Sequence, residues 1–186
     1  MLAPLAAVVL FLAAIISAFW YLRLEEVDRE HEAVKRDVEY AQQRIRLRLL
    51  ERQEQLMRVA REASNREIDL EEFSSRAETL VSQYPELQAV TWIDERRRIR
   101  ASYAAPSVNS GQLRIPGSNL RPGETENMFG LARDVMQPVY SQPAAGTDTS
   151  ALLQLHIPLG DQGRFLGVLL AEYSIDGLLR YTVPAE

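Results

Sequence analysis

Cysteine is absent from this chain of 186 residues, and histidine occurs only at His31 and His156. The missing cysteines exclude a disulfide framework, a thiol nucleophile and the zinc sites that depend on Cys ligands. Two isolated histidines do not form a metal cluster, so we expect neither a metal nor another cofactor. The formal net charge of −5 argues against nucleic acid as a partner, because phosphate backbones attract basic surfaces.

Charged side chains are also missing from residues 1–22, where only Pro4 and Ser17 interrupt an apolar run. A helix of this length is roughly 33 Å long, which matches a hydrocarbon core of about 30 Å. Trp20 and Tyr21 lie where interfacial aromatic residues are expected. The segment therefore predicts a transmembrane anchor, with a lipid bilayer as partner.

A cleaved signal peptide is the alternative interpretation of this segment. The run has no basic residue before Ala3, is longer than an ordinary signal-peptide core, and is not followed by a small-x-small cleavage site. These features favour the anchor. Flanking charge does not fix its orientation, because Arg23 is followed at once by Glu25 and Glu26.

Residues 23–65 contain neither glycine nor proline and interleave acidic with basic side chains, which predicts one continuous helix. A heptad seam occupies its first half, at Leu24, Val27, His31, Val34, Val38, Ala41 and Ile45. A displaced stripe follows at Leu49, Leu56 and Ala63. We expect the first half to form a homodimer with a second chain and the second half to pack on its own domain. A helix that packs only on its own domain remains the alternative.

The remaining chain changes its hydrophobic period from helical to alternating and back. A proline- and glycine-rich loop is expected over 104–123, and a polar linker over 142–150. Three arginines at 96–98 sit at the tip of the first hairpin, where we expect them to be solvated. The predicted helices are 69–83 and 125–136, and the predicted strands are 87–94, 99–103, 137–141, 152–159 and 164–173.

The last two strands form a hairpin with a four-residue turn at 160–163. If Leu159 lies opposite Arg164, Leu155 lies beside Val168 and one face is entirely aliphatic. We expect this face to pack on the helices. The opposite face, roofed by the long loop and the 125–136 helix, then encloses a pocket, although a wetter sheet face that binds nothing is the alternative. That opposite face would carry Gln154, His156, Phe165, Gly167, Ala171 and Tyr173.

Four phrases in the second half carry a resemblance to a known family: 84–94 (YPELQAVTWID), 138–141 (PVYS), 157–170 and the closing 173–179. With the order of the elements, they make the chain resemble extracellular Cache sensor domains, a PAS-like fold of bacterial sensor histidine kinases and chemoreceptors. The resemblance is strongest to the N-terminal part of a histidine kinase. It implies a single α+β module with helices on one face of an antiparallel sheet and a loop-covered ligand site on the other.

This resemblance gives a division into an anchor (1–22), a juxtamembrane helix (23–65), a sensor domain (66–182) and a truncated linker (183–186). It implies that the domain lies in the periplasm, on the outer side of the bacterial inner membrane. Arg100 and Arg133 are candidates to pair with a carboxylate or amino acid ligand, because guanidinium groups match that geometry. The other candidate ligand-binding residues are aromatic or polar, namely Trp92, Tyr103, Tyr140, Tyr173, His156 and Gln154.

The predicted function is therefore a membrane-anchored sensor that binds a small metabolite and signals through its long helix. We expect no catalytic residues, because the chain has no kinase signature and no Gly-x-Ser-x-Gly nucleophile motif. The parent receptor would be a two-component histidine kinase, or alternatively a chemoreceptor or a cyclic-di-nucleotide enzyme. A membrane-anchored coiled-coil scaffold for an envelope protein is the alternative of a different class.

Overall fold

An antiparallel sheet organises the second of two compact units, Met1–Arg44 and Ile45–Glu186. The computed structural model describes the backbone of residues 2–108, 113–120, 122–142, 144–145 and 151–182, and between residues 2 and 34 it describes side chains at five positions. The helices are α1 (Leu2–Ser64), α2 (Leu70–Gln83), α3 (Glu124–Val135) and α4 (Ile175–Thr182). The strands are β1 (Leu87–Asp94), β2 (Ile99–Ala104), β3 (Val139–Tyr140), β4 (Ala144–Ala145), β5 (Ala151–Asp161) and β6 (Arg164–Ser174).

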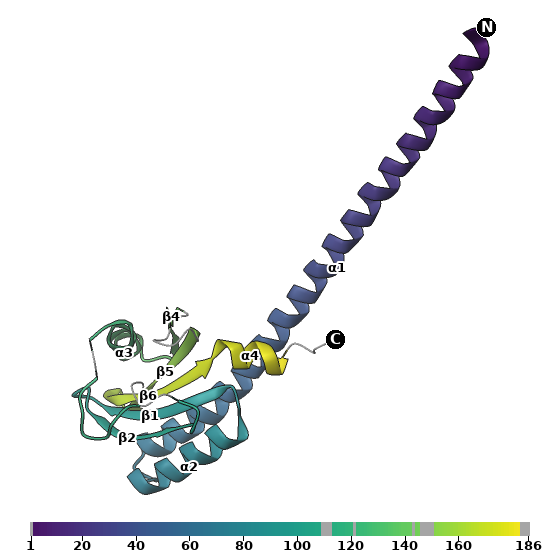
Figure 1. Cartoon of the computed structure of the whole chain (residues 1–186). Coiled ribbons are helices and arrows are strands. Elements are labelled where there is room, and N and C mark those ends of the chain that lie inside the picture. Colours follow the sequence, from purple (N-terminus) through teal and green to yellow (C-terminus); the bar gives the residue numbers. More distant parts are fainter. Residues whose placement is uncertain (1, 109–112, 121, 143, 146–150, 183–186) are drawn as a thin grey trace. The chain divides into compact units, whose positions relative to one another are not determined.

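The sheet has the order β2-β1-β6-β5-β3, with β4 also paired to β5, and its pairs are antiparallel (Figure 1). The two long hairpins β1–β2 and β5–β6 therefore meet along β1 and β6 in the middle. The loop after β2 covers the β2 edge, where Gly117 N donates to Ile99 O at 2.8 Å and Ile99 N donates to Ser118 O at 2.9 Å. The predicted α+β class and antiparallel sheet are confirmed.

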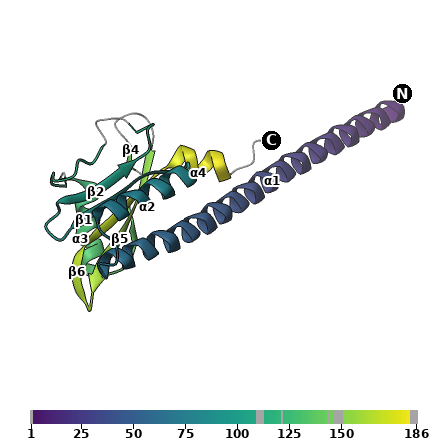
Figure 2. The ribbon, with the colours of Figure 1, turned by 90° about the horizontal axis from the view of Figure 1, so that it is seen from below.

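The larger core lies on the sheet face that packs against α2 and the last turns of α1 (Figure 2). Asp69 caps α2 by accepting a hydrogen bond from Glu72 N at 2.8 Å, and the helix buries Phe73, Ala77 and Val81. From α1 the core receives Leu56, Val59, Ala60 and Ala63. The second half of the predicted long helix therefore packs on its own domain, as expected.

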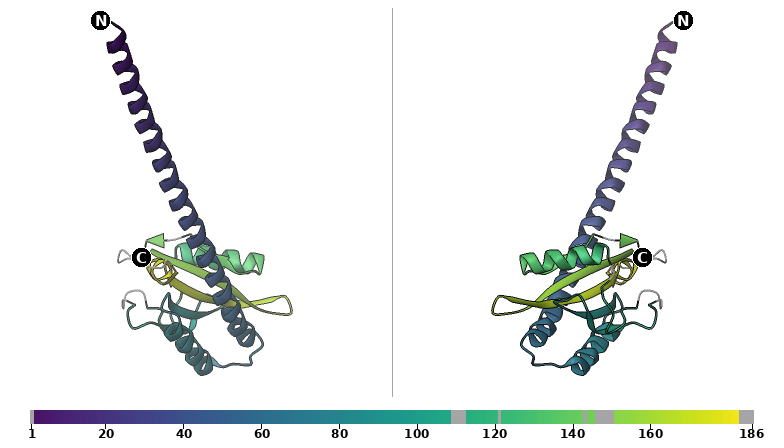
Figure 3. Two further views of the ribbon diagram at one scale, coloured as in Figure 1. Left: turned by 90° about the vertical axis from the view of Figure 1, so that its right-hand side faces the viewer. Right: turned by 90° about the vertical axis from the view of Figure 1, so that its left-hand side faces the viewer.

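A smaller core lies on the opposite face, beneath α3 (Figure 3). Phe129 and Ala132 of α3 are fully buried against this face, and Phe129 meets Phe165 edge to face with ring centroids 5.5 Å apart. The sheet thus has helices on both faces and not on one, as the resemblance implied, with α3 and part of the preceding loop as the roof.

The register of the β5–β6 hairpin differs from the predicted one. Gln162 and Gly163 both have positive φ, 47° and 82°, which closes a two-residue turn instead of four and extends both strands. A register shift between Leu159 and Gly160 then adds a further residue, so that Leu155 pairs with Ala171 and not with Val168. Because the total slip is odd, the side chains of β6 exchange faces.

Val168 and Leu170 consequently lie beneath α3, whereas Tyr173 and Ala171 join the larger core with Leu155. The prediction that Ala171 and Tyr173 share a face with Gln154 and His156 is therefore wrong. The prediction that the wetter face lies under the loop and the 125–136 helix agrees with the structure.

The predicted heptad seam lies mostly in the first unit. Leu24, Val27, His31 and Val34 fall outside the described side chains, and Val38 is exposed. The homodimer stays a prediction. In the part of the chain that the structure describes, no helix qualifies as long and apolar enough to cross a membrane.

Gly167 of β6 lies against the backbone of β1, and it provides a stability test. Its φ is 147°, and a Cβ there would overlap the carbonyl oxygen of Ile93. We expect Gly167→Ala to reduce the free energy of unfolding by at least about 2 kcal/mol, because backbone strain and overlap add. Denaturant unfolding followed by circular dichroism would measure the change.

Gly130→Ala is the matched control, because a Cβ at Gly130 of α3 would meet no atom within 4 Å. In a helix this change stabilises by about 0.5–1 kcal/mol. Equal effects of the two substitutions would contradict the proposed packing of β6 on β1.

Candidate ligand-binding site

A buried pair of opposite charges lies on the roofed face of the sheet. Glu172 projects from the middle of β6 and is only 7% exposed. Arg114, from the loop after β2, donates to it through two nitrogens, from Nε to Oε2 at 2.9 Å and from Nη2 to Oε1 at 2.7 Å. Such a two-bond guanidinium–carboxylate pair is directional as well as charged, so it holds the loop on the sheet.

Gln154 of β5 extends this pair into a network. Its Nε2 donates to Glu172 Oε1 at 2.9 Å, and its Oε1 accepts from Thr125 Oγ1 at 3.0 Å. Its backbone N–H donates to Ser141 Oγ at 3.1 Å, and Ser141 N donates to Gln154 O at 2.8 Å. The network therefore joins the loop, α3, β5, β6 and the segment after β3.

His156 lies two residues along β5 on the same face and is completely buried. Neither ring nitrogen has a hydrogen-bond partner among the described residues. Burial, and after it the charge of Arg114, lower the pKa of His156 to about 4. The backbone of Thr125 acts in the opposite direction and raises this pKa by a smaller amount. The imidazole is therefore neutral at pH 7.

A small cavity of about 10 Å³ adjoins the charged pair, which is room for a single water molecule. The side chains of Arg114 and Glu172 both line this cavity. The cavity is lined by Gln88, Ala89, Ser102, Ala104, Val108, Arg114, Leu152 and Glu172.

Of the eight predicted ligand-binding residues, Gln154 and His156 lie in this region. Tyr140 and Tyr173 instead pack with the larger core. Burial raises the pKa of Tyr140 to about 12, and its hydroxyl donates to Gln53 Oε1 of α1 at 3.1 Å. Burial, with Tyr140 and Glu86 nearby, also raises the pKa of Tyr173. The odd register slip explains the position of Tyr173.

Trp92 and Tyr103 also face α2 and not the roof. Trp92 packs edge to face on Phe73, with ring centroids 5.4 Å apart, and the hydroxyl of Tyr103 donates to Glu78 Oε1 at 3.4 Å. They are elements of packing between the sheet and α2, so the structure does not bring the predicted aromatic walls together around one ligand.

The two predicted arginines lie outside the network. Arg100 is exposed on β2, with Nη1 3.8 Å from Asp94 Oδ2. Arg133 is exposed near the end of α3, and its Nε donates to the neighbouring Asp134 at 2.9 Å. The arginine that pairs with the buried carboxylate of Glu172 is instead Arg114, and the ligand-pairing role of Arg100 and Arg133 stays a prediction.

Sequence reasoning missed Arg114 and Glu172. The sequence does indicate that Glu172 is unusual, because it is the only acidic residue between Arg164 and Tyr173, in a strand that is otherwise largely apolar. A lone carboxylate there must be exposed, paired or protonated. No feature of the sequence indicates that Arg114 is buried, because a basic residue in a polar loop is usually solvated.

No family model matches this chain, and no characterised protein matches it in sequence. Among solved structures, it is similar to an extracellular ligand binding receptor from Desulfohalobium retbaense DSM5692, with 19% identity and a TM-score of 0.50 over 75% of this chain and 25% of that one. A ligand-binding domain of the Pseudomonas aeruginosa PAO1 amino acid chemoreceptor PctC in complex with GABA gives 14% identity and a TM-score of 0.48, over 70% and 55% of the two chains.

Methyl-accepting Chemotaxis protein X gives 13% identity and a TM-score of 0.47, over 64% of this chain and 51% of that chain. The chain therefore spans about half the length of the two chemotaxis receptor structures and a quarter of the Desulfohalobium receptor structure. At these identities the likeness concerns the fold alone. The chain shares the fold of this extracellular ligand binding receptor, in agreement with the resemblance to extracellular sensor domains drawn from the sequence.

The buried His156 predicts a dependence of stability on pH. Because its pKa falls from 6.5 to about 4 on folding, the unfolded chain binds the extra proton between these values. Stability should therefore be complete above pH 6.5 and decline as the pH falls. We expect protonation of His156 in the unfolded chain to lower the free energy of unfolding by about 2 kcal/mol between pH 7 and pH 5.

Denaturant unfolding of wild type and His156→Gln at both pH values would isolate this effect, since the carboxylates titrate equally in both proteins. The variant should lose about 2 kcal/mol less than wild type. Identical losses would show that His156 is solvated or paired.

Proposed function

We propose that this chain is the sensory part of a membrane receptor, a non-enzymatic module outside the cytoplasm that binds a small zwitterion between Arg114 and Glu172. The observation that carries the proposal is the buried pair itself, with side chains that are 16% and 9% exposed. The expected absence of catalysis, the membrane anchor over 1–22 and the periplasmic location belong to the same proposal.

The ligand class follows from the charges. A carboxylate group matches the fork of Arg114, and an ammonium group matches the carboxylate of Glu172. A molecule with both groups replaces each half of the internal ion pair, so neither buried charge is left unpaired. An amine or a carboxylate with a single charge would leave one of the two buried side chains without a partner, which is costly in a buried site. Amino acids and short amino-carboxylates therefore fit better than ligands with a single charge.

Entry of the ligand would separate the loop that carries Arg114 from β6, and the network offers a physical connection from there to α1. Gln154 contacts Glu172 and is bonded twice to Ser141. Tyr140 precedes Ser141 in the chain, and its hydroxyl donates a hydrogen bond to Gln53 Oε1 of α1. A ligand that changes the position of Gln154 thereby acts on the strand that holds this helix.

Three further contacts hold α1 on its own domain, two of them to the connection between α2 and β1. The guanidinium of Arg52 lies 3.5 Å over the ring of Tyr84 and its Nε lies 3.6 Å from the buried Glu86. Gly160 N donates to Ser64 Oγ at 3.1 Å near the end of the helix. Signalling requires that the ligand binds two arrangements with different affinity, and a complete switch takes about 5.5 kcal/mol.

For the output we propose a two-component histidine kinase, with a chemoreceptor or a cyclic-di-nucleotide enzyme as alternatives. In each case α1 would connect the sheet to the membrane anchor, and the receptor would act as a homodimer through the seam that includes Val38.

A thermal-shift experiment tests the ligand class. At a hundred times its dissociation constant, a zwitterion should stabilise the full chain by about 2.7 kcal/mol and raise the Tm by about 5–11 °C. Amino acids and GABA would be compared with simple amines and carboxylates. Both Arg114→Gln and Glu172→Gln should remove the shift, because each leaves one end of the ligand unpaired.

Arg133→Gln is the matched control, because it removes an exposed arginine outside the network and should preserve the shift. A shift that survives in Glu172→Gln would contradict the zwitterion site. Comparable shifts with ligands of a single charge would exclude the pairing argument, and the absence of any shift would favour a scaffold that binds a protein.

Cross-linking tests the proposed homodimer, and the lack of native cysteine makes each introduced thiol unique. Val38 lies on the heptad seam and is 50% exposed, whereas Tyr40 is 54% exposed but off the seam. We expect Val38→Cys in membranes to form disulfide-linked dimers under mild oxidation and Tyr40→Cys to form few. Equal cross-linking at both positions would argue against a defined seam.

A further inference from the structure

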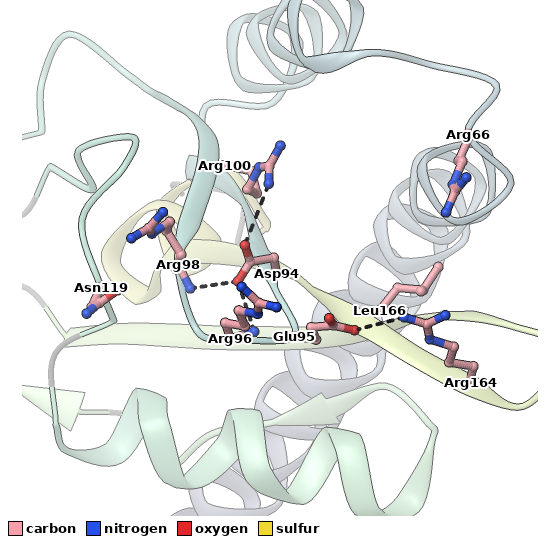
Figure 4. A pocket seen from close by; sticks show the side chains of 9 residues that line it. All are labelled: Arg66, Asp94, Glu95, Arg96, Arg98, Arg100, Asn119, Arg164 and Leu166. Carbon is pink, nitrogen blue, oxygen red and sulfur yellow. Dashed lines mark hydrogen bonds and ion pairs between the residues drawn. The ribbon is translucent and has the colours of Figure 1, made fainter.

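A second hollow lies at the tip of the β1–β2 hairpin, formed by residues other than those of the Arg114–Glu172 site (Figure 4). Its volume is about 510 Å³, which lies in the range of small-molecule sites. Three separate parts of the chain contribute arginines to it, namely the connection after α1, the β1–β2 hairpin and the start of β6. These are Arg66, Arg96, Arg98, Arg100 and Arg164.

The charge of this hollow is strongly positive, with five arginines against Asp94 and Glu95. Asp94 Oδ1 is already occupied, since it accepts the backbone N–H groups of Arg96 and Arg98 at 2.9 Å each. Glu95 reaches only Arg164, at 3.7 Å. Within the described part of the chain, the guanidinium groups of Arg66, Arg96 and Arg98 have no carboxylate at ion-pair distance.

Arg66 is notable for its backbone as well as its charge. It follows the end of α1 with a φ of 58°, in the left-handed region where glycine or asparagine is favoured. Its side chain lies on the opposite side of the hollow from Arg100 (Figure 4). An arginine is therefore accommodated where the backbone favours a different residue, and it adds charge to the hollow.

An apolar hollow of about 400 Å³ continues from the charged one, because the two share Arg66, Asp94, Arg100 and Leu166. Its own walls include Ile68, Leu70 and Trp92. Leu70 is 38% exposed, so part of this apolar surface faces solvent. The two hollows thus form one groove, defined here as the tip groove, with a cationic half and an apolar half.

We propose that the tip groove is a second binding site, for an amphipathic anion with a phosphate or carboxylate head and a short alkyl or aryl chain. The head lies in the cationic half of the groove, where Arg66, Arg96 and Arg98 each present a guanidinium group without an acidic partner. The chain lies against Leu70 and Trp92, where it removes apolar surface from water. This site is independent of the zwitterion proposed for Arg114 and Glu172.

Fluorescence of Trp92 provides the test, because Trp92 forms part of the apolar wall and the chain has two tryptophans. The full chain with Trp20→Phe, in nanodiscs of phosphatidylcholine, would be titrated with hexyl phosphate and hexanoate. We expect a saturable change in Trp92 emission with at least one of them. Ethyl phosphate should bind at least about tenfold more weakly, since each buried methylene contributes about fourfold.

Charge removal distinguishes the tip groove from unspecific partition into the nanodisc. Arg66→Gln with Arg98→Gln should weaken binding at least about tenfold, whereas Arg133→Gln on α3 should change it less than about twofold. Leu70→Ser should reduce the advantage of hexyl over ethyl phosphate. If the double variant does not fold, Arg96→Gln with Arg164→Gln replaces it, because both side chains are exposed.

Three results would overturn the proposal. One is the same emission change with neutral hexyl glucoside, which would show that charge plays no part. Another is equal weakening by Arg133→Gln and by the double variant. The third is no response of Trp92 to either anion while circular dichroism shows a folded chain.

Discussion

The register between β5 and β6 decides which side chains reach each face of the central sheet. It is fixed by the two-residue turn at Gln162 and Gly163 and by the irregularity opposite Gly167. Gly167 allows the backbone of β6 to approach Ile93 of β1 more closely than any side chain would permit. A shift of one residue at this point would exchange the apolar and polar sides of β6, and with them the position of Glu172.

The buried ion pair follows from that register. Once Glu172 lies on the roofed face, its carboxylate needs a partner, because an isolated charge in the interior is far more costly than a paired one. Arg114 provides the partner from a loop and not from a strand, so a contact that stabilises the roof comes from outside the sheet. The smaller core around Phe129 holds α3 in place beside it. Apolar packing and charge pairing are thus carried by neighbouring side chains on one face.

The other face has a different role. There α1 is held by apolar packing of Leu56 and Ala63 and by polar contacts at Arg52, Gln53 and Ser64. The hydroxyl of Tyr140 connects this face to the network on the roofed side, since Tyr140 and Ser141 are consecutive. The aromatic residues expected to surround a ligand therefore serve mainly to join the sheet to α1 and α2, which is where a conformational signal would have to pass.

The sequence by itself determined most of the elements, because hydrophobic period, capping by Asp69 and the Tyr84-Pro85 break are local signals. It also determined which half of α1 packs on the domain and that Gln154 and His156 share the wetter face. It did not indicate β4, which lies within the expected linker 142–150. Only the tertiary structure decided that Tyr173 belongs to the larger core, that Arg114 reaches Glu172 across 58 positions, and that Arg66 joins the hairpin arginines. The reason is physical: helices and turns depend on neighbours in sequence, whereas register and charge pairing depend on which distant backbones approach one another.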